Sequence, residues 1–563
     1  MKRSVEIALE LWVAALVLLE LCFRARLVPR LNIHWDEYHF LSQIYDTTRG
    51  GVESAAQTFY VRFFLWLLNV PGGEIAQILA GRWIMFVLSV LSTLLIFRLS
   101  RLFFSTLSSL FVVLAFHSTS NVIVHGAAFR YDPLLSFVFI LSLWMSFAFQ
   151  RTVVTACLSG VLLGLGAAMN IKTGLLQAWL LLAVMSDNAS EPQVKKRTVW
   201  LGIQGLSAIL VFAACFVSQQ RAVAEKVSTS VRPTLPTLAV GFLGGGAPSL
   251  GSFVASLTEN PVFWVLFFAS WPILLKELCR QRQVLSKRLT PVCVFAGGVL
   301  ILFIYRNAWP YFYVCILPAA SLIFGALIEA VVSAASTQRS ALLSLLALTC
   351  LTFGTGVDHF ARLNFDGIAD QRSIVEEVHD LFPTPVPYID RCGMISSFPK
   401  VGLFLSSYVL EHYREEGRPI YESLLRNEQP RFLLANAPEL ERVFAETPGG
   451  EEARSLLPDD EAVLRASFVH YLGPIYVPGF ELQLEAGEEK TVQVKLSGTY
   501  QAKTGCGLSV NGQSISNGES VELSENVAVA ATSPGPCRVR FVGMPPELGD
   551  PSRIPGGEQI FTY

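Results

Sequence analysis

The sequence predicts a polytopic α-helical membrane protein followed by an extracytoplasmic α/β domain and a small β-sandwich. Only 16% of the 563 residues are charged and 52% are hydrophobic, whereas soluble domains carry about 25% charged residues. Apolar runs of roughly 17–22 residues, long enough to cross a bilayer, recur from Val5 to about Val357. They stop beyond Asn364. These observations divide the chain into a membrane domain at 1–360, an α/β domain at 361–482 and a β-sandwich at 483–563.

About eleven transmembrane helices are expected from the apolar runs. They cover about 5–23, 76–97, 104–121, 131–149, 153–169, 171–186, 199–218, 261–275, 290–305, 310–332 and 340–357. The Gly/Pro/Ser-rich stretch 219–260 is expected to be a long outer loop that covers a lipid-facing site.

The charges of the short loops predict the orientation of the chain. Basic residues are enriched in cytoplasmic loops, and they recur at every second turn, for example at Arg98, Arg151, 195–197, 276–288 and Arg339. This pattern puts the N-terminus in the cytoplasm. An odd number of spans then places the C-terminal region outside.

The C-terminal region reads as extracytoplasmic soluble protein. The segment "QRSIVEEVHDLF" has helical spacing, and "VPYID" and "RFLLANAP" resemble short buried strands. From residue 484 on, alternating strands and an Asn511-Gly512 hairpin turn indicate the β-sandwich. Cys506 and Cys537 both lie at strand ends, which predicts a disulfide in an oxidising compartment.

Ionisable and aromatic residues gather at the outer ends of the expected spans. Charged groups at membrane depth cost a few kcal/mol each on insertion scales, so they are functional candidates. Several on one face indicate one site. The candidate residues are Asp36, Glu37, His125, Arg130, Asp132, Lys172, Arg306, Tyr311 and Tyr313.

The loop "HWDEYHF" contains the candidate acid. Asp36 could act as a general base that removes a proton from a hydroxyl. The alternative is a solvated loop with its aromatic residues in the membrane interface. His34 and His39 could join the carboxylates in binding a divalent metal, but no spacing typical of a metal site supports this, and no metal is predicted.

The cationic candidates suit a phosphate group. Arg130 and Lys172 lie at membrane edges where a phosphate could bind. Asp132, followed by proline, also fits a helix N-cap, and Lys172 could instead snorkel into the interface. Arg306 is a further phosphate candidate, and Tyr311 and Tyr313 could line a groove or simply belong to an aromatic belt.

Several motifs together resemble a known family. The segments "HWDEYHF", "AGRWIMFVLSVLSTLLIFRLSRLF", "FRYDPLLSFVFIL", "NIKTGLL" and "PYFYVCILPA" are similar in order and spacing to the GT-C integral-membrane glycosyltransferases. The similarity covers roughly 1–357 and is greatest to the protein O-mannosyltransferases and the bacterial aminoarabinose transferases. It implies a protein of the bacterial inner or plasma membrane that works in the cell envelope.

The resemblance implies transfer of a sugar from a polyprenyl-phosphate donor to an acceptor outside the membrane, with inversion at the anomeric carbon. Asp36 would be the base and Glu37 a second carboxylate, while Arg130, Asp132 and Lys172 would hold the donor phosphate. The acceptor could be a lipid, a polysaccharide or a protein. The net charge of −2 gives no reason to expect nucleic acid.

Two other functions remain compatible with the sequence. One is a flippase or transporter for polyprenyl-linked glycans, although no internal repeat typical of transporters is visible. The other is a non-catalytic membrane protein with a carbohydrate-binding tail, which leaves Arg130 and Lys172 without a role.

Overall fold

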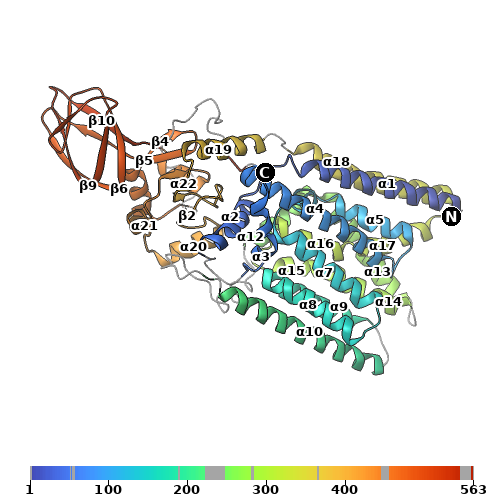
Figure 1. The fold of residues 1–563 in the computed structure, drawn as a ribbon. Coiled ribbons are helices and arrows are strands. Elements are labelled where there is room, and N and C mark those ends of the chain that lie inside the picture. The colour runs from blue at the N-terminus through green and yellow to red at the C-terminus, as the bar shows by residue number, and fades with distance from the viewer. Residues whose placement is uncertain are drawn as a thin grey trace.

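The protein is a polytopic helical membrane protein with a C-terminal sheet region (Figure 1). The computed structural model describes residues 3–50, 52, 57–187, 191–221, 223, 247–280, 285–363, 367–445, 455–545 and 560–561. A helical bundle forms one end of the molecule and the strands form the other, with a mixed layer of helices and short strands between them (Figure 1).

The bundle is built from helices that follow the apolar runs. They are α1 (Arg3–Leu27), α2 (Trp35–Arg49), α3 (Val61–Phe64), α4 (Gly73–Ser100), α5 (Thr106–His117), α6 (Ser120–His125), α7 (Tyr131–Ala148), α8 (Val153–Met169), α9 (Lys172–Ser186), α10 (Glu191–Gln220), α12 (Ala247–Glu259), α13 (Pro261–Arg280), α14 (Leu285–Gly297), α15 (Ile301–Ile304), α16 (Tyr313–Ala320), α17 (Ile323–Ala334) and α18 (Gln338–Arg362).

A helix or a broken pair of helices lies over each expected span, but the number of eleven is not confirmed. Within the described residues, five helices are long and apolar enough to cross a membrane, or six if the bent pair Pro310–Ala320 and Ile323–Ala334 is one span. Helices such as α5, with 12 residues, are shorter than a bilayer needs. The helix α1 is 25 residues long but has Glu20 and Arg24 buried among its apolar residues.

Two stretches expected as loops are helical. Residues 35–49 form α2, because His34 caps the helix and Glu37 completes a capping box. Residues 247–259, in the expected outer loop, form α12. Most of that expected cover, 224–246, lies outside the described residues.

The helices α8 and α10 pack closely through two glycines four residues apart. A Cβ atom at Gly160 would lie 2.4 Å from the Gln204 carbonyl oxygen, and one at Gly164 would lie 2.5 Å from that of Ala208. Small residues at this spacing let two membrane helices approach backbone to backbone. The contact therefore fixes α10 along the outer side of the bundle (Figure 1).

The sheet region is more continuous than the sequence predicts. The elements after the bundle are α19 (Gly367–Leu381), β1 (Tyr388–Ile389), β2 (Lys400–Val401), α20 (Ser407–Glu416), α21 (Tyr421–Glu428), β3 (Phe432–Leu434), α22 (Pro438–Phe444), α23 (Pro458–Ser467), β4 (Phe468–Leu472), β5 (Ile475–Leu484), β6 (Glu489–Thr504), β7 (Leu508–Val510), β8 (Gln513–Ile515), β9 (Ser520–Ala531) and β10 (Cys537–Gly543). Helix α19 and strands β1 and β3 lie where the sequence predicts them.

One sheet runs through both parts, in the order β2-β1-β3-β5-β10-β6-β9-β7-β8, with β4 paired to β5. The expected domain boundary at 482/483 falls within β5, which pairs with β3 near its start and with β10 farther along. A register shift between Val494 and Gly498 interrupts the pairing of β6 with β9. A β-bulge of this kind bends a strand, and the last six strands enclose their own apolar core.

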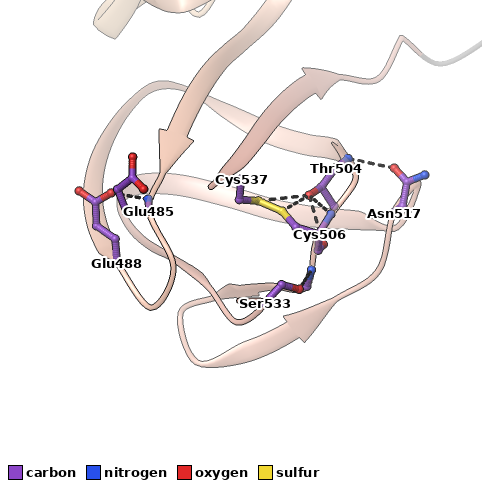
Figure 2. The surroundings of a disulfide bond; sticks show 8 residues. Glu485, Glu488, Thr504, Cys506, Asn517, Ser533 and Cys537 are labelled. Carbon is purple, nitrogen blue, oxygen red and sulfur yellow. Dashed lines mark hydrogen bonds between the residues drawn. A yellow bond between two sulfur atoms is a disulfide. The ribbon is translucent and has the colours of Figure 1, made fainter. Parts of the chain in front are cut away.

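The predicted disulfide and hairpin are confirmed. Cys506 and Cys537 are bonded, and Thr504 Oγ1 lies beside both sulfur atoms (Figure 2). Asn511 and Gly512 both have positive φ, at 49° and 80°, as a two-residue hairpin turn requires. The turn joins β7 to β8, where Val510 pairs with Gln513.

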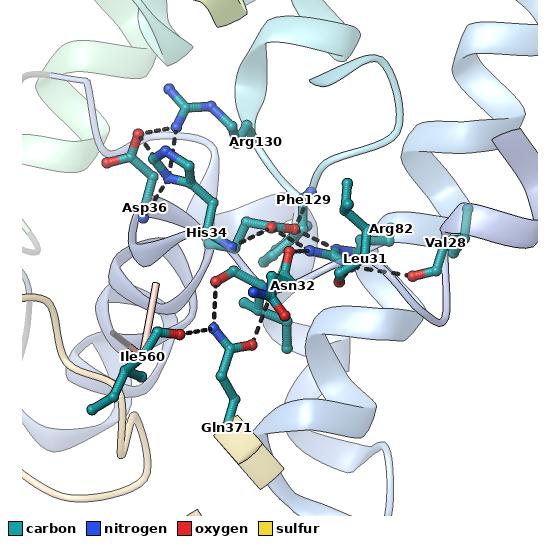
Figure 3. A network of polar contacts seen from close by, with 12 residues as sticks. Val28, Leu31, Asn32, His34, Asp36, Arg82, Phe129, Arg130, Gln371 and Ile560 are labelled. Atoms are coloured by element: carbon teal, nitrogen blue, oxygen red, sulfur yellow. Dashed lines mark hydrogen bonds and ion pairs between the residues drawn. The ribbon is translucent and has the colours of Figure 1, made fainter. Parts of the chain in front are cut away.

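Hydrogen bonds join the C-terminal region to the chain around α2. The side-chain amide of Gln371 donates to the Ile33 carbonyl at 2.9 Å, and its oxygen accepts from the Ile33 amide at 2.9 Å (Figure 3). Arg49, at the end of α2, donates to the carbonyls of Ser396 and Phe398, each at 2.8 Å. These bonds fix α2 between the bundle and the sheet region.

The disulfide should stabilise the sheet region. Its loss in a Cys506→Ala/Cys537→Ala variant is expected to lower the free energy of unfolding by about 2–4 kcal/mol, because a cross-link restricts the unfolded chain. Thermal unfolding with and without reductant measures this. Cys22→Ala, which removes an exposed free thiol, is the control and should change nothing; equal unfolding temperatures for all three proteins would contradict the prediction.

Candidate active site

The site begins at the N-terminus of α2. The Nδ1 atom of His34 accepts a hydrogen bond from the Asp36 amide at 3.0 Å, and the Glu37 carboxylate accepts from the His34 amide at 2.9 Å. These bonds satisfy backbone donors that the first turn of a helix leaves open. As a result Asp36 and Glu37 are neighbours in sequence but contact different partners.

Four buried charges of alternating sign form the centre of the site. Asp36 pairs with Arg130 Nη1, and Arg130 Nε donates to Asp132 at 3.2 Å. Lys172 Nζ lies 2.9 Å from the other oxygen of Asp132. The exposed fractions of these residues are between 0% and 8%. Buried charges persist when each has a partner of opposite sign, and here the four formal charges cancel.

The chain brings these groups together from three helix starts. Asp36 lies at the start of α2, Arg130 and Asp132 at the start of α7, and Lys172 at the start of α9. Arg130 and Asp132 flank Tyr131 in the sequence. At the start of α9, the Asn170 side chain accepts a hydrogen bond from the Lys172 amide at 2.9 Å. The starts of these three helices therefore position each charge.

Aromatic rings surround the two cations. The guanidinium of Arg130 lies 3.7 Å from the centre of the Tyr311 ring, and Lys172 Nζ lies 4.6 Å from the same ring. The rings of Tyr131 and Phe312 lie 5.1 and 5.3 Å from Lys172 Nζ. Ring faces attract cations, so Tyr311 stabilises both positive charges and closes one side of the site.

Two histidines complete the polar wall without adding charge. The His34 and His125 rings lie 6.4 Å apart, and His125 packs edge-on against Tyr311. Burial, reinforced by the positive charge of Arg130, holds the pKa of His34 well below its usual value. Burial also lowers the pKa of His125 to about 4, against the opposing effect of Asp132 and Glu37. Both imidazoles are neutral near pH 7.

Glu37 is committed to a second ion pair. Its two oxygens accept from Arg82 Nη2 and Nε, both at 2.7 Å, and one also accepts from the Phe129 amide at 2.7 Å (Figure 3). Arg82 further donates to the carbonyls of Leu31 and Asn32. A bidentate pair of this kind is geometrically specific. It ties α2, α4 and the loop before Arg130 together, so Glu37 positions the site.

A narrow apolar crevice lies beside Arg130. No space in it is large enough to hold a water molecule. Its lining residues, contributed by α2, α3, α4, α7 and the chain before them, are Phe40, Tyr60, Phe64, Met85, Phe129, Arg130, Tyr131 and Leu134. Arg130 therefore contacts apolar side chains on one side and the other charges of the site on another.

Two of the predicted site residues lie apart from this centre. Arg306 forms an ion pair with Glu411 of α20, at 2.6 Å, and both side chains are partly exposed. Tyr313 is buried one residue after the 3₁₀ turn Pro310–Phe312, and its hydroxyl has no hydrogen-bond partner among the described residues. The structure thus joins Asp36, His125, Arg130, Asp132, Lys172 and Tyr311 and leaves these two outside.

Sequence reasoning missed several contributors. Arg82 could have been identified from the sequence, because it is a lone charge within an apolar run. Tyr131 lies in the same motif as Arg130. An aromatic residue at a membrane edge gives no signal that separates a site residue from one in the aromatic belt. His39 turns away from the charges, stacking on Phe404 with 3.8 Å between ring centres. Among the described residues, no group of three or more His, Cys, Asp or Glu side chains is arranged to hold a metal ion.

Solved structures with a similar arrangement are known. Archaeal oligosaccharyltransferase AglB from Archaeoglobus fulgidus, in complex with an inhibitory peptide and a dolichol-phosphate, is 12% identical, with 75% of this chain and 69% of that chain covered and a TM-score of 0.49. ArnT from Cupriavidus metallidurans is 13% identical, with 77% and 93% covered and a TM-score of 0.49. Arabinofuranosyltransferase AftD from Mycobacteria is 12% identical, with 95% and 58% covered and a TM-score of 0.45.

These proteins are the kind of enzyme that the sequence motifs resemble. No family model matches the chain, and no curated protein matches it. At 12–13% identity the likeness concerns the fold alone, so the chemistry of the site rests on its own residues.

Breaking the buried Glu37–Arg82 pair should destabilise the protein strongly. Arg82→Met leaves the Glu37 carboxylate buried without its charge partner, at an expected cost of about 3–5 kcal/mol. Thermal unfolding of the purified protein measures the loss. The matched control is Arg306→Met, which breaks a partly exposed pair and should cost less than about 1 kcal/mol. Equal losses in the two variants would contradict a structural role for Glu37.

The His125 imidazole should make the fold sensitive to acid. Its pKa is about 4 when folded and near 6.5 when unfolded, so the unfolded chain binds the proton first. Stability is therefore full above pH 6.5 and falls as the pH drops towards 4, by at most about 3 kcal/mol because the ring is partly exposed. Melting temperatures from pH 7.5 to 4 should fall less steeply for His125→Asn; parallel curves would refute the assignment.

Proposed function

We propose that this protein is a membrane-embedded glycosyltransferase. It moves a sugar from a polyprenyl-phosphate carrier to an acceptor on the extracytoplasmic face, with the N-terminus in the cytoplasm. The observation that carries the proposal is the row of buried charges Asp36–Arg130–Asp132–Lys172 beside an apolar crevice. A carboxylate, two cations and an apolar space are what a lipid-borne phosphosugar needs.

The donor is expected to lie with its phosphate at the cations, and its lipid would enter between the apolar side chains that line the crevice. Arg130 lines the crevice, and both Arg130 and Lys172 lie close to the Tyr311 ring. A guanidinium binds two phosphate oxygens at once, and an ammonium adds a point charge. This arrangement stabilises the phosphate where its negative charge grows as the bond to the sugar breaks.

The reaction is a single displacement. The acceptor hydroxyl attacks the anomeric carbon, the bond from that carbon to the phosphate oxygen breaks, and polyprenyl phosphate leaves with the electron pair. Asp36 takes the proton of the attacking hydroxyl. Because attack and departure occur on opposite faces of the sugar, the anomeric configuration inverts.

Donor binding can also release the base. In the ligand-free protein Asp36 is held by Arg130, where it cannot accept a proton efficiently. A phosphate that engages Arg130 competes with the Asp36 carboxylate for the guanidinium. Asp132 still holds Arg130 through Nε, so the cation stays in place while the carboxylate turns to the acceptor.

The test is the Asp36→Asn variant. It keeps the shape of the side chain but removes the base, so sugar transfer should fall by about 10²–10⁴-fold. The assay supplies lipid extract from cells lacking the protein as donor and the envelope fraction of the same cells as acceptor, and it measures released polyprenyl phosphate. Asp46→Asn, which alters a partly exposed pair with Arg49 on the same helix, is the control.

The outcomes separate the competing functions. Full activity in Asp36→Asn would remove the base assignment. Movement of labelled lipid across reconstituted vesicles without release of polyprenyl phosphate would identify a flippase instead.

A further inference from the structure

The helix α2 separates two different environments. Asp36 and Phe40, one turn apart, face the bundle, where Asp36 pairs with Arg130 and Phe40 lines the crevice. Trp35 and His39, also one turn apart, face the extracytoplasmic region, where both rings contact Phe404 at 5.5 and 3.8 Å between centres. The start of α2 therefore contacts the bundle with one face and the C-terminal region with the other.

A cation from the extracytoplasmic region lies on the second side. The guanidinium of Arg391 lies 4.5 Å from the centre of the Trp35 ring, next to the residue that carries the carboxylate. Its charge, after burial and Arg130, contributes to the lowered pKa of His34. Arg391 thus acts on the same group that caps α2.

The backbone holds Arg391 firmly in this position. Its amide donates to the Asn436 side chain at 3.0 Å, and its carbonyl accepts from the Leu405 amide at 3.1 Å. The preceding Asp390 carboxylate accepts from the amides of Gly393 and Met394, both at 2.7 Å. A residue pinned on both sides is preorganised for binding.

The side chain of Arg391, in contrast, is partly exposed. Its Nε atom is buried without a hydrogen bond, and within the described parts of the chain the guanidinium forms no ion pair. Arg82 and Arg130 are both paired with carboxylates. The neighbouring Asp390 carboxylate accepts hydrogen bonds from the Gly393 and Met394 amides and from the Asn436 side chain instead. A buried donor without a partner is costly unless a ligand supplies one.

We infer that Arg391 binds an anionic group of the acceptor, a phosphate or a carboxylate, at the start of α2, where Trp35 precedes the proposed base Asp36. This inference rests on the proposed function. The acceptor is the expected source, because Arg391 comes from the extracytoplasmic region and lies across α2 from the crevice. The anion at Arg391 would place the attacking hydroxyl beside Asp36, which makes Arg391 a specificity-determining residue.

The experiment compares apparent KM values for the two substrates with full-length wild type, Arg391→Gln and Arg391→Lys. Lipid extract and envelope fraction from cells lacking the protein serve as donor and acceptor. Arg391→Gln should raise the apparent KM for the envelope fraction about tenfold, the effect expected when a charged hydrogen bond of roughly 1.5 kcal/mol is lost. It should leave the KM for the lipid extract unchanged. Arg391→Lys should restore most of the affinity.

The control is Arg426→Gln, which removes an exposed arginine of α21 paired with Glu422 and should leave both KM values unchanged. The labelled product should also bind to an anion-exchange resin. If Arg391→Gln is less stable, the Lys variant retains the charge over Trp35 and separates folding from binding.

Three results would overturn the inference. Unchanged KM values in Arg391→Gln would show that Arg391 does not bind the acceptor and has only a structural contact with Trp35. A raised KM for the lipid extract alone would assign the anion to the donor phosphate. A labelled product that passes through the resin would exclude an anionic acceptor. If the wild type transfers no sugar, the proposed function fails, and this inference fails with it.

Discussion

The ion pairs of the Arg130 guanidinium are the interactions on which the rest of the site depends. The guanidinium is buried and shared between two carboxylates, Asp36 on one helix and Asp132 on its own. Asp132 in turn holds Lys172 from a third helix. A charge in a low-dielectric region is tolerated only with its partners in place, so the starts of α2, α7 and α9 must assemble together. The geometry of the site is thereby coupled to the packing of the bundle.

A second ion pair transmits this constraint to the neighbouring elements. Glu37 and Arg82 link α2 to α4, and the Phe129 amide adds the loop that leads into Arg130. The two adjacent acids therefore have different partners and different roles. Glu37, with both oxygens engaged by Arg82, orients the helix, while Asp36 pairs with Arg130 at the centre of the site.

The site lies between two different environments. One side is an apolar crevice, and the other is formed by the C-terminal region with Arg391 over Trp35. The proposed reaction would use both sides, one for a lipid-borne group and one for a water-borne group. The hydrogen bonds of Gln371 and Arg49 hold the C-terminal region in a fixed position against α2 and the chain before it.

The sequence by itself determined the helix positions, the C-terminal strands, the hairpin at Asn511 and the Cys506–Cys537 bond, because apolar length, period-two alternation and turn chemistry are local signals. It also selected most of the charged centre, since a charge at a membrane edge is conspicuous. It failed for α2, because the polar residues of a capped helix read as a loop. Only the tertiary structure decided which charges are partners, because Asp36 and Arg130, like Arg306 and Glu411, lie about a hundred residues apart. The contact of Arg391 with Trp35 had no local signal, since it exists only after the C-terminal region packs on α2.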